Sequence, residues 1–134
     1  MPLEGTMHVY ETQKESGLKL VQDVPEVHTG IDNFQMTQSG DTLLAGAHPI
    51  LYKIFAHIGD VVSRAPSSVI RLPLSNGLVD HEKITELFYD HGDLISGSTV
   101  AQIHSGQLLI GSVIDKLVVC DLYGKVVGRK GGKI

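Results

Sequence analysis

The chain has 134 residues and a formal net charge of −4, with 42% apolar and 19% charged residues. Its length predicts a single domain with a hydrophobic core of its own. The acidic balance argues against nucleic acid as a partner, because binding a phosphate backbone requires clustered Lys and Arg. No apolar stretch reaches the roughly 20 residues of a membrane-spanning helix. The first residues carry no secretory signal, so the signal of an exported parent protein is expected upstream.

Short apolar runs, each bounded by Gly, Pro, Asn or Asp, recur along the chain and predict β-strands. About ten strands are expected, at residues 7–11, 18–24, 31–35, 42–47, 52–57, 68–72, 83–89, 99–104, 107–112 and 117–123. Residues 50–62 offer a helical alternative, because Ile50, Ile54 and Ile58 would lie on one face of a helix. The Lys53-Ile54-Phe55 core of this segment fits a strand equally well, and the strand is the preferred interpretation.

Two segments of the chain follow the same plan. Residues 40–46 lead to an apolar run at 53–55, and residues 106–111 lead to one at 116–119. Each begins with a turn containing glycine, continues as an apolar strand that ends at glycine, and reaches a second strand after a short connection. Such duplication fits the four-stranded antiparallel blades of a propeller, of which this length accommodates about two. A small sandwich or barrel has a similar strand count and stays the alternative.

Several blocks of residues, taken together in their order and spacing, resemble the paraoxonase and arylesterase family. Near the C-terminus these blocks are Gly97-Ser98-Thr99-Val100-Ala101, Gly106-Gln107-Leu108-Leu109-Ile110-Gly111, Lys116, and Cys120 followed by Asp121 and Leu122. Upstream they are His8-Val9-Tyr10-Glu11, Asp32-Asn33, Gly40-Asp41, Gly46-Ala47-His48-Pro49 and Lys53-Ile54-Phe55. The resemblance covers residues 7–122 and is to the C-terminal region of the family's chains.

The resemblance implies an all-β fold consisting of about two C-terminal blades of a six-bladed β-propeller, each an antiparallel four-stranded sheet. The blades are expected in residues 1–123, followed by a basic, glycine-rich tail at residues 124–134. The implied activity is calcium-dependent hydrolysis of small aryl esters and lactones, completed by the remaining blades of a longer protein. The isolated chain is expected to be inactive. The alternative is a non-catalytic relative that acts as a chaperone or membrane-protein assembly factor.

Asp32 and Asn33 match a dipeptide that supplies ligands to the catalytic calcium ion in this family. Calcium is a hard cation that takes about six to eight oxygen ligands, and one carboxylate plus one amide carbonyl supply two with limited mutual repulsion. Without the resemblance, an Asp-Asn pair close to Gly30 is an ordinary turn signal. The family's catalytic histidine dyad and its other calcium ligands have no counterpart in the chain.

His48 matches a histidine at the mouth of the family's active site and is the candidate catalytic residue, which would orient substrate or relay a proton near neutral pH. An isolated histidine is also common as a polar residue at a strand end. Phe55, Thr99 and Val113 match positions that line the family's substrate pocket, although each also fits ordinary core packing. Ala47 stands where the family commonly has a cysteine.

Cys120 is the only cysteine in the chain, and composition alone predicts a small buried hydrophobic residue. The resemblance implies instead a disulfide between Cys120 and a cysteine upstream of Met1, which closes the propeller ring. Such a bond implies an oxidising compartment and therefore a secreted, extracellular or membrane-associated parent protein. Association with a membrane or lipoprotein is expected to involve the missing N-terminal region.

Overall fold

The structure is a computed structural model that describes residues 5–25, 27 and 29–122. Within these residues the strands are β1 (Met7–Thr12), β2 (Leu18–Val24), β3 (Gly30–Met36), β4 (Thr42–His48), β5 (Ser67–Ser75), β6 (Leu78–Val79), β7 (Thr85–Asp90), β8 (Ser98–His104), β9 (Gln107–Ser112) and β10 (Val118–Asp121). The helices are α1 (Leu51–Gly59) and the short 3-10 helix η1 (His81–Lys83). No helix within these ranges is long and apolar enough to cross a membrane. The predicted tail at 124–134 lies outside the described residues.

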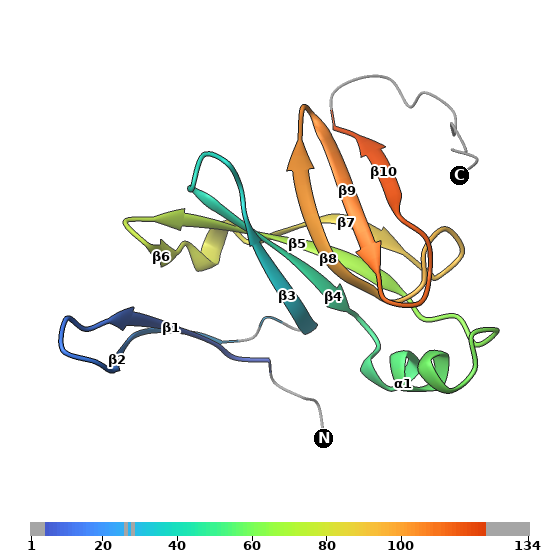
Figure 1. Cartoon of the computed structure of the whole chain (residues 1–134), viewed down its shortest axis with the longest axis horizontal. Helices are drawn as coiled ribbons and strands as arrows, with labels where there is room; N and C mark the ends of the chain where they lie inside the picture. The colour runs from blue at the N-terminus through green and yellow to red at the C-terminus, as the bar shows by residue number, and fades with distance from the viewer. Residues whose placement is uncertain (1–4, 26, 28, 123–134) are drawn as a thin grey trace.

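The central sheet is an antiparallel meander in which β3, β4, β5 and β7 are neighbours in that order (Figure 1). The short strand β6 forms a hairpin with the end of β5. Asn76-Gly77 closes that hairpin with two residues of positive φ, and Ser105-Gly106 does the same between β8 and β9. Two-residue turns of this kind match the right-handed twist of the strands that they join. The central sheet therefore has the full strand set of a propeller blade.

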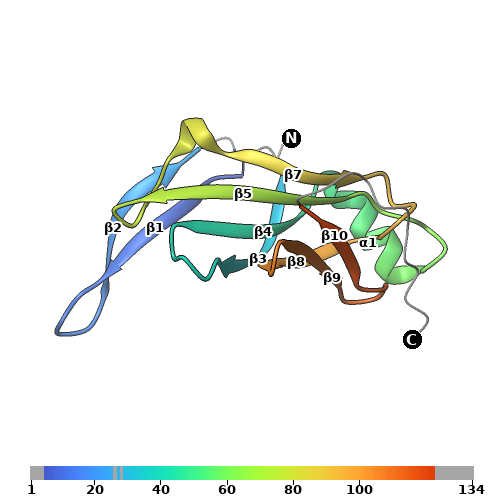
Figure 2. The ribbon, with the colours of Figure 1, turned by 90° about the horizontal axis from the view of Figure 1, so that it is seen from above.

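Two smaller antiparallel sheets flank the central one. The hairpin β1–β2 lies on one side, and β8, β9 and β10 form a three-stranded sheet on another (Figure 2). Strand β8 packs directly against β3 and β4 of the central sheet. The prediction of an all-β fold made of antiparallel propeller blades is confirmed, and the sheets are open, as in part of a propeller.

The hydrophobic core consists of two clusters, one on each face of the central sheet. Side chains of a strand alternate between the two faces of its sheet, and β4 follows this rule. Ala45 and Ala47 face the cluster beneath the β1–β2 hairpin, whereas Leu44 faces the cluster beneath the three-stranded sheet. The apolar run of β4 is therefore continuous because both of its faces are covered, as in a sheet buried between layers.

The strand predicted at residues 52–57 was wrong, because this segment forms helix α1 between β4 and β5. Ile54 and His57 are its buried residues, and their spacing of three places them on one face. Tyr52, Phe55 and Ile58 are exposed. Of Ile50, Ile54 and Ile58, only Ile54 is buried within the helix, which packs against the rest of the chain through Ile54 and His57.

Two further strand predictions differ in their details. The segment predicted as a strand from residue 83 begins with the last residue of η1, and β7 starts only at Thr85. Strand β6 was missed, because two residues are too few for a periodic pattern. The remaining strands lie where their apolar runs predicted, with ends that differ by a few residues at most.

Candidate functional site

The two predicted calcium ligands lie in a β-bulge of β3. In the pairing of β3 with β4, Ile31 lies opposite Ala47 and Phe34 lies opposite Ala45. Asp32 and Asn33 therefore share the single position opposite Gly46. A bulge of this kind interrupts the regular alternation and changes the direction of the side chains that it carries, which is why bulges are frequent beside active sites.

His48 lies at the end of β4, beside the bulge. Its Nε2 atom is 3.7 Å from Oδ2 of Asp32. The side chain of His48 is 10% exposed and that of Asp32 is 37% exposed, so the pair is at the boundary between core and solvent. The structure thus brings together the predicted metal ligand and the predicted catalytic residue, which are 16 positions apart in the sequence.

Burial sets the protonation state of His48. It lowers the pKa of His48 below the ordinary value of 6.5, while the negative charge of Asp32 acts in the opposite direction. The imidazole is therefore neutral at pH 7. Its Nδ1 atom is buried and has no hydrogen-bond partner among the described residues. A neutral ring with one unused nitrogen can accept a proton or bind a polar group of a ligand.

The side-chain amide of Asn33 reaches a different sheet. Its Nδ2 atom donates a hydrogen bond of 3.1 Å to the carbonyl oxygen of Thr99 on β8. The amide nitrogen is thereby occupied, and the carbonyl oxygen of the same side chain is left as the available acceptor. Thr99, predicted as a pocket residue, thus contacts the predicted metal ligand through its backbone.

A large hollow of about 1080 Å³ opens beside His48, between β1, β3 and α1. His48 and Phe55 both line it, so the structure places these two predicted site residues together. Tyr10, Phe34 and Tyr52 line it as well. Four of the seven aromatic residues in the chain therefore border one hollow. A concave apolar surface with few polar groups is typical of small-molecule sites.

Three of these aromatic residues were not predicted for the site. Tyr10 comes from the β1–β2 hairpin and Phe34 from β3, so only the tertiary fold brings them to Phe55. A period-two pattern shows that such side chains alternate along a strand, but it does not show what they face. Tyr52 was missed because its segment was predicted as a strand, and the helical phase places it beside the hollow.

Val113 and Cys120 lie away from the hollow. Val113 follows β9 and is 81% exposed. Cys120 is a free, half-buried thiol on β10 that packs against the core beneath the three-stranded sheet. Burial raises the pKa of Cys120, and the neighbouring charge of Asp121 adds to this effect. The thiol is therefore protonated near neutral pH, which is typical of a structural cysteine.

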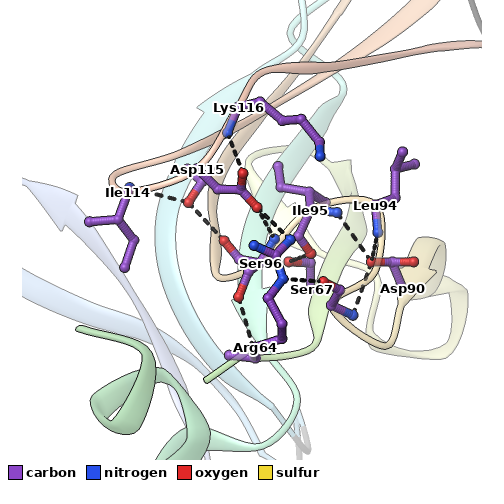
Figure 3. Close-up of polar contacts among 12 residues, drawn as sticks. Arg64, Ser67, Asp90, Leu94, Ile95, Ser96, Ile114, Asp115 and Lys116 are labelled. Atoms are coloured by element: carbon purple, nitrogen blue, oxygen red, sulfur yellow. Dashed lines mark hydrogen bonds and ion pairs between the residues drawn. The ribbon is translucent and has the colours of Figure 1, made fainter. Parts of the chain in front are cut away.

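The loop that leads into β8 is held by two carboxylates (Figure 3). Asp90 Oδ2 accepts hydrogen bonds from three backbone N–H groups of this loop, those of Gly92, Leu94 and Ile95. Asp115 Oδ2 accepts hydrogen bonds from the guanidinium of Arg64 at 2.7 Å and from the N–H of Ser96 at 2.8 Å. These contacts fix the start of β8, and therefore the position of the Thr99 carbonyl that Asn33 contacts.

The oxygen atoms of the bulge suit a hard cation, but the bulge supplies fewer ligands than such a cation takes. Asp32 and Asn33 offer a carboxylate and an amide oxygen, whereas calcium takes about six to eight oxygen ligands. Among the residues that the structure describes, no group of three or more His, Cys, Asp and Glu is arranged to hold a metal. A calcium ion at the bulge would need further oxygen ligands from outside this part of the chain.

Comparison with known proteins agrees with the resemblance in the sequence. A family model named Arylesterase matches residues 2–122. Serum paraoxonase/arylesterase 1 of Homo sapiens is 33% identical over 120 residues, which cover 90% of the chain and 32% of that protein. The mouse protein of the same name is 34% identical over 120 residues, and human serum paraoxonase/arylesterase 2 is 31% identical over 121 residues. Each of these matches also covers 32% of the relative, so the chain spans about a third of the length of these curated relatives.

Proposed function

This chain belongs to the arylesterase family, and we propose on that basis that it supplies part of the active site of a calcium-dependent hydrolase of aryl esters and lactones. The single observation that carries the proposal is the bulge at Asp32 and Asn33. In it, the carboxylate of Asp32 lies 3.7 Å from the buried His48, and His48 lines a hollow together with aromatic side chains. Metal ligands, a proton-accepting group and an apolar binding surface are the parts that ester hydrolysis requires.

Each residue would have a defined role. Asp32 and Asn33 would hold the calcium ion through Oδ2 and Oδ1. Calcium, when bound, supplies electrostatic stabilisation of the oxyanion that develops on the ester carbonyl. His48 would orient the substrate or relay a proton, because it lines the hollow in which a substrate would lie. Phe55 would pack against the apolar part of the substrate and exclude water from that side.

The roles of the other predicted site residues stay predictions. Thr99 and Val113 do not line the hollow formed by the described residues. Additional blades would extend the hollow, and we propose that these two residues border the substrate in that larger pocket. Cys120 is proposed to bond to a cysteine of an upstream segment, in a secreted parent protein. The relatives are named as serum proteins, which supports that location.

The proposal is tested in a chimera that joins this chain to the upstream part of human serum paraoxonase/arylesterase 1. We expect calcium-dependent hydrolysis of an aryl ester, and a loss of about 100-fold or more in kcat/KM for Asp32→Ala, because a direct ligand is removed. Glu82→Ala is the matched control, since Glu82 is an exposed carboxylate on η1. The metal assignment is wrong if Asp32→Ala retains both calcium and activity. Calcium binding without hydrolysis would favour the non-catalytic alternative.

A further inference from the structure

The central sheet and the three-stranded sheet touch at Gly46. A Cβ atom added to Gly46 would overlap the carbonyl carbon of Thr99 and the amide nitrogen of Val100, and would lie 2.6 Å from the Thr99 carbonyl oxygen. The backbones of β4 and β8 therefore approach more closely than any residue with a side chain permits. This contact lies beside the bulge, because Gly46 is the residue opposite Asp32 and Asn33.

A second bulge faces the first one. In the pairing of β8 with β9, Ser98 lies opposite Ser112 and Val100 lies opposite Gly111, so Thr99 has no partner of its own in the register. Its carbonyl oxygen accepts the hydrogen bond from Asn33 instead. A backbone carbonyl can only accept a hydrogen bond, so the amide of Asn33 must present its nitrogen, and not its oxygen, to β8.

Buried hydroxyl groups hold β8 at this distance. Ser98 is fully buried, and its Oγ atom accepts a 3.0 Å hydrogen bond from the N–H of Ser68 on β5. The same hydroxyl lies 3.0 Å from the carbonyl oxygens of Ala47 and Ser68, which share its single proton. The N–H of Ser98 donates in turn to Oγ of Ser67. Thr99 is therefore tied to both β4 and β5 through the preceding residue.

We propose that the Thr99 carbonyl is the positioning group that orients the Asn33 amide, so that its oxygen is presented to the calcium ion. This inference rests on the proposed function and deepens it, because it assigns the orientation of one ligand to a contact between two sheets. It also gives a reason for an amide at position 33. An aspartate there has no N–H for Thr99, and its second oxygen would face the carbonyl oxygen and be repelled.

The experiment compares Asn33→Asp with Gln35→Glu in the chimera described above, whose upstream part supplies the further calcium ligands that the described residues of this chain lack. Both variants add one carboxylate to exposed positions of β3, but only the first removes the hydrogen bond to Thr99. Thermal unfolding is measured without calcium, and calcium affinity is measured by calorimetric titration. We expect Asn33→Asp to lower the Tm by roughly 3–5 °C relative to Gln35→Glu. We also expect it to weaken calcium binding about 10- to 100-fold, despite the added negative charge.

The two measurements decide the proposal separately from the function. If Asn33→Asp binds calcium as tightly as the unaltered chimera or more tightly, Thr99 does not orient the ligand. If the calcium-free Tm is unchanged, the hydrogen bond between the sheets does not form, and the inference fails even when calcium binding is lost. Asp32→Asn keeps the contact with Thr99 and removes a ligand charge, so unchanged calcium affinity in that variant would contradict the proposed function instead.

Discussion

At the scale of single residues, Gly46 is the position where the packing of two sheets is most sensitive. We expect Gly46→Ala to reduce the free energy of unfolding by roughly 1–3 kcal/mol, because the new methyl group overlaps backbone atoms of Thr99 that cannot rotate away. Urea unfolding followed by circular dichroism measures the change. The matched control is Gly59→Ala at the end of α1, where a Cβ has no neighbour within 4 Å. Equal stability of the two variants would disprove the close contact between β4 and β8.

Single residues also show how much of the candidate site could be predicted from the sequence. Asp32, Asn33, His48 and Phe55 were identified by their place in matching blocks of residues. The structure brings His48 close to Asp32 and places His48 and Phe55 in the lining of one hollow, whereas Asn33 contacts Thr99. The contact of Asn33 with Thr99 could not be predicted, because it depends on two bulges whose unpaired residues face each other across separate sheets. No periodic pattern in a sequence shows which residue of an apolar run is displaced by a bulge.

At the scale of elements, the loop before β8 depends on Asp115. Burial raises the pKa of Asp115, but the N–H groups of Lys116 and Ser96 and the guanidinium of Arg64 outweigh this effect and keep it below the ordinary value of 3.8. A carboxyl group whose pKa is lower in the folded chain than in the unfolded chain stabilises the fold. This stabilisation is fully present at pH values above the pKa of the unfolded chain. That contribution is lost as pH falls below about 3.8 through the lower, folded value.

Asp115→Asn is therefore expected to change both the stability of the chain and its pH dependence. At pH 7 we expect a loss of roughly 1–3 kcal/mol, because Arg64 loses its charged partner. Below pH 4 the difference between the variant and the unaltered chain should shrink, since Asp115 is then being protonated. Denaturant unfolding from pH 7 to pH 3 measures this, with the exposed Asp93→Asn as control. A difference that is the same at every pH would exclude the charged contact as its cause.

The strands and the helix also differ in how well their type and bounds could be predicted from the sequence. Strands such as β2 and β9 were predicted with their observed bounds, because an apolar run between turn residues is a local signal. The segment of helix α1 was predicted as a strand, with a helix only as the alternative, since nine residues hold too few turns for the helical period to prevail over a short strand pattern. Its packing is decided by a distant residue: a Cβ at Gly97 would collide with Ile54, so the absence of a side chain there makes room for the helix.

At the scale of the whole molecule, the described residues form one full blade with a smaller sheet on either side. Within them β1 pairs only with β2, and β10 pairs only with β9, so each has one edge without a strand. Open edges are sites where further strands add. The all-β architecture could be predicted from the apolar runs and the resemblance, although the run at residues 53–55 of the duplicated plan lies in helix α1. The way the β1–β2 hairpin completes the hollow could not be predicted, because Tyr10 reaches it only through the arrangement of separate sheets.

The central claim is that Asp32 and Asn33 bind calcium beside His48, and a crystal structure of the chimera grown with calcium tests it most directly. We expect density for one cation about 2.3–2.6 Å from a carboxylate oxygen of Asp32 and from Oδ1 of Asn33, with Nδ2 of Asn33 still directed to the Thr99 carbonyl. The claim is contradicted if every bound cation lies elsewhere and both side chains extend into solvent.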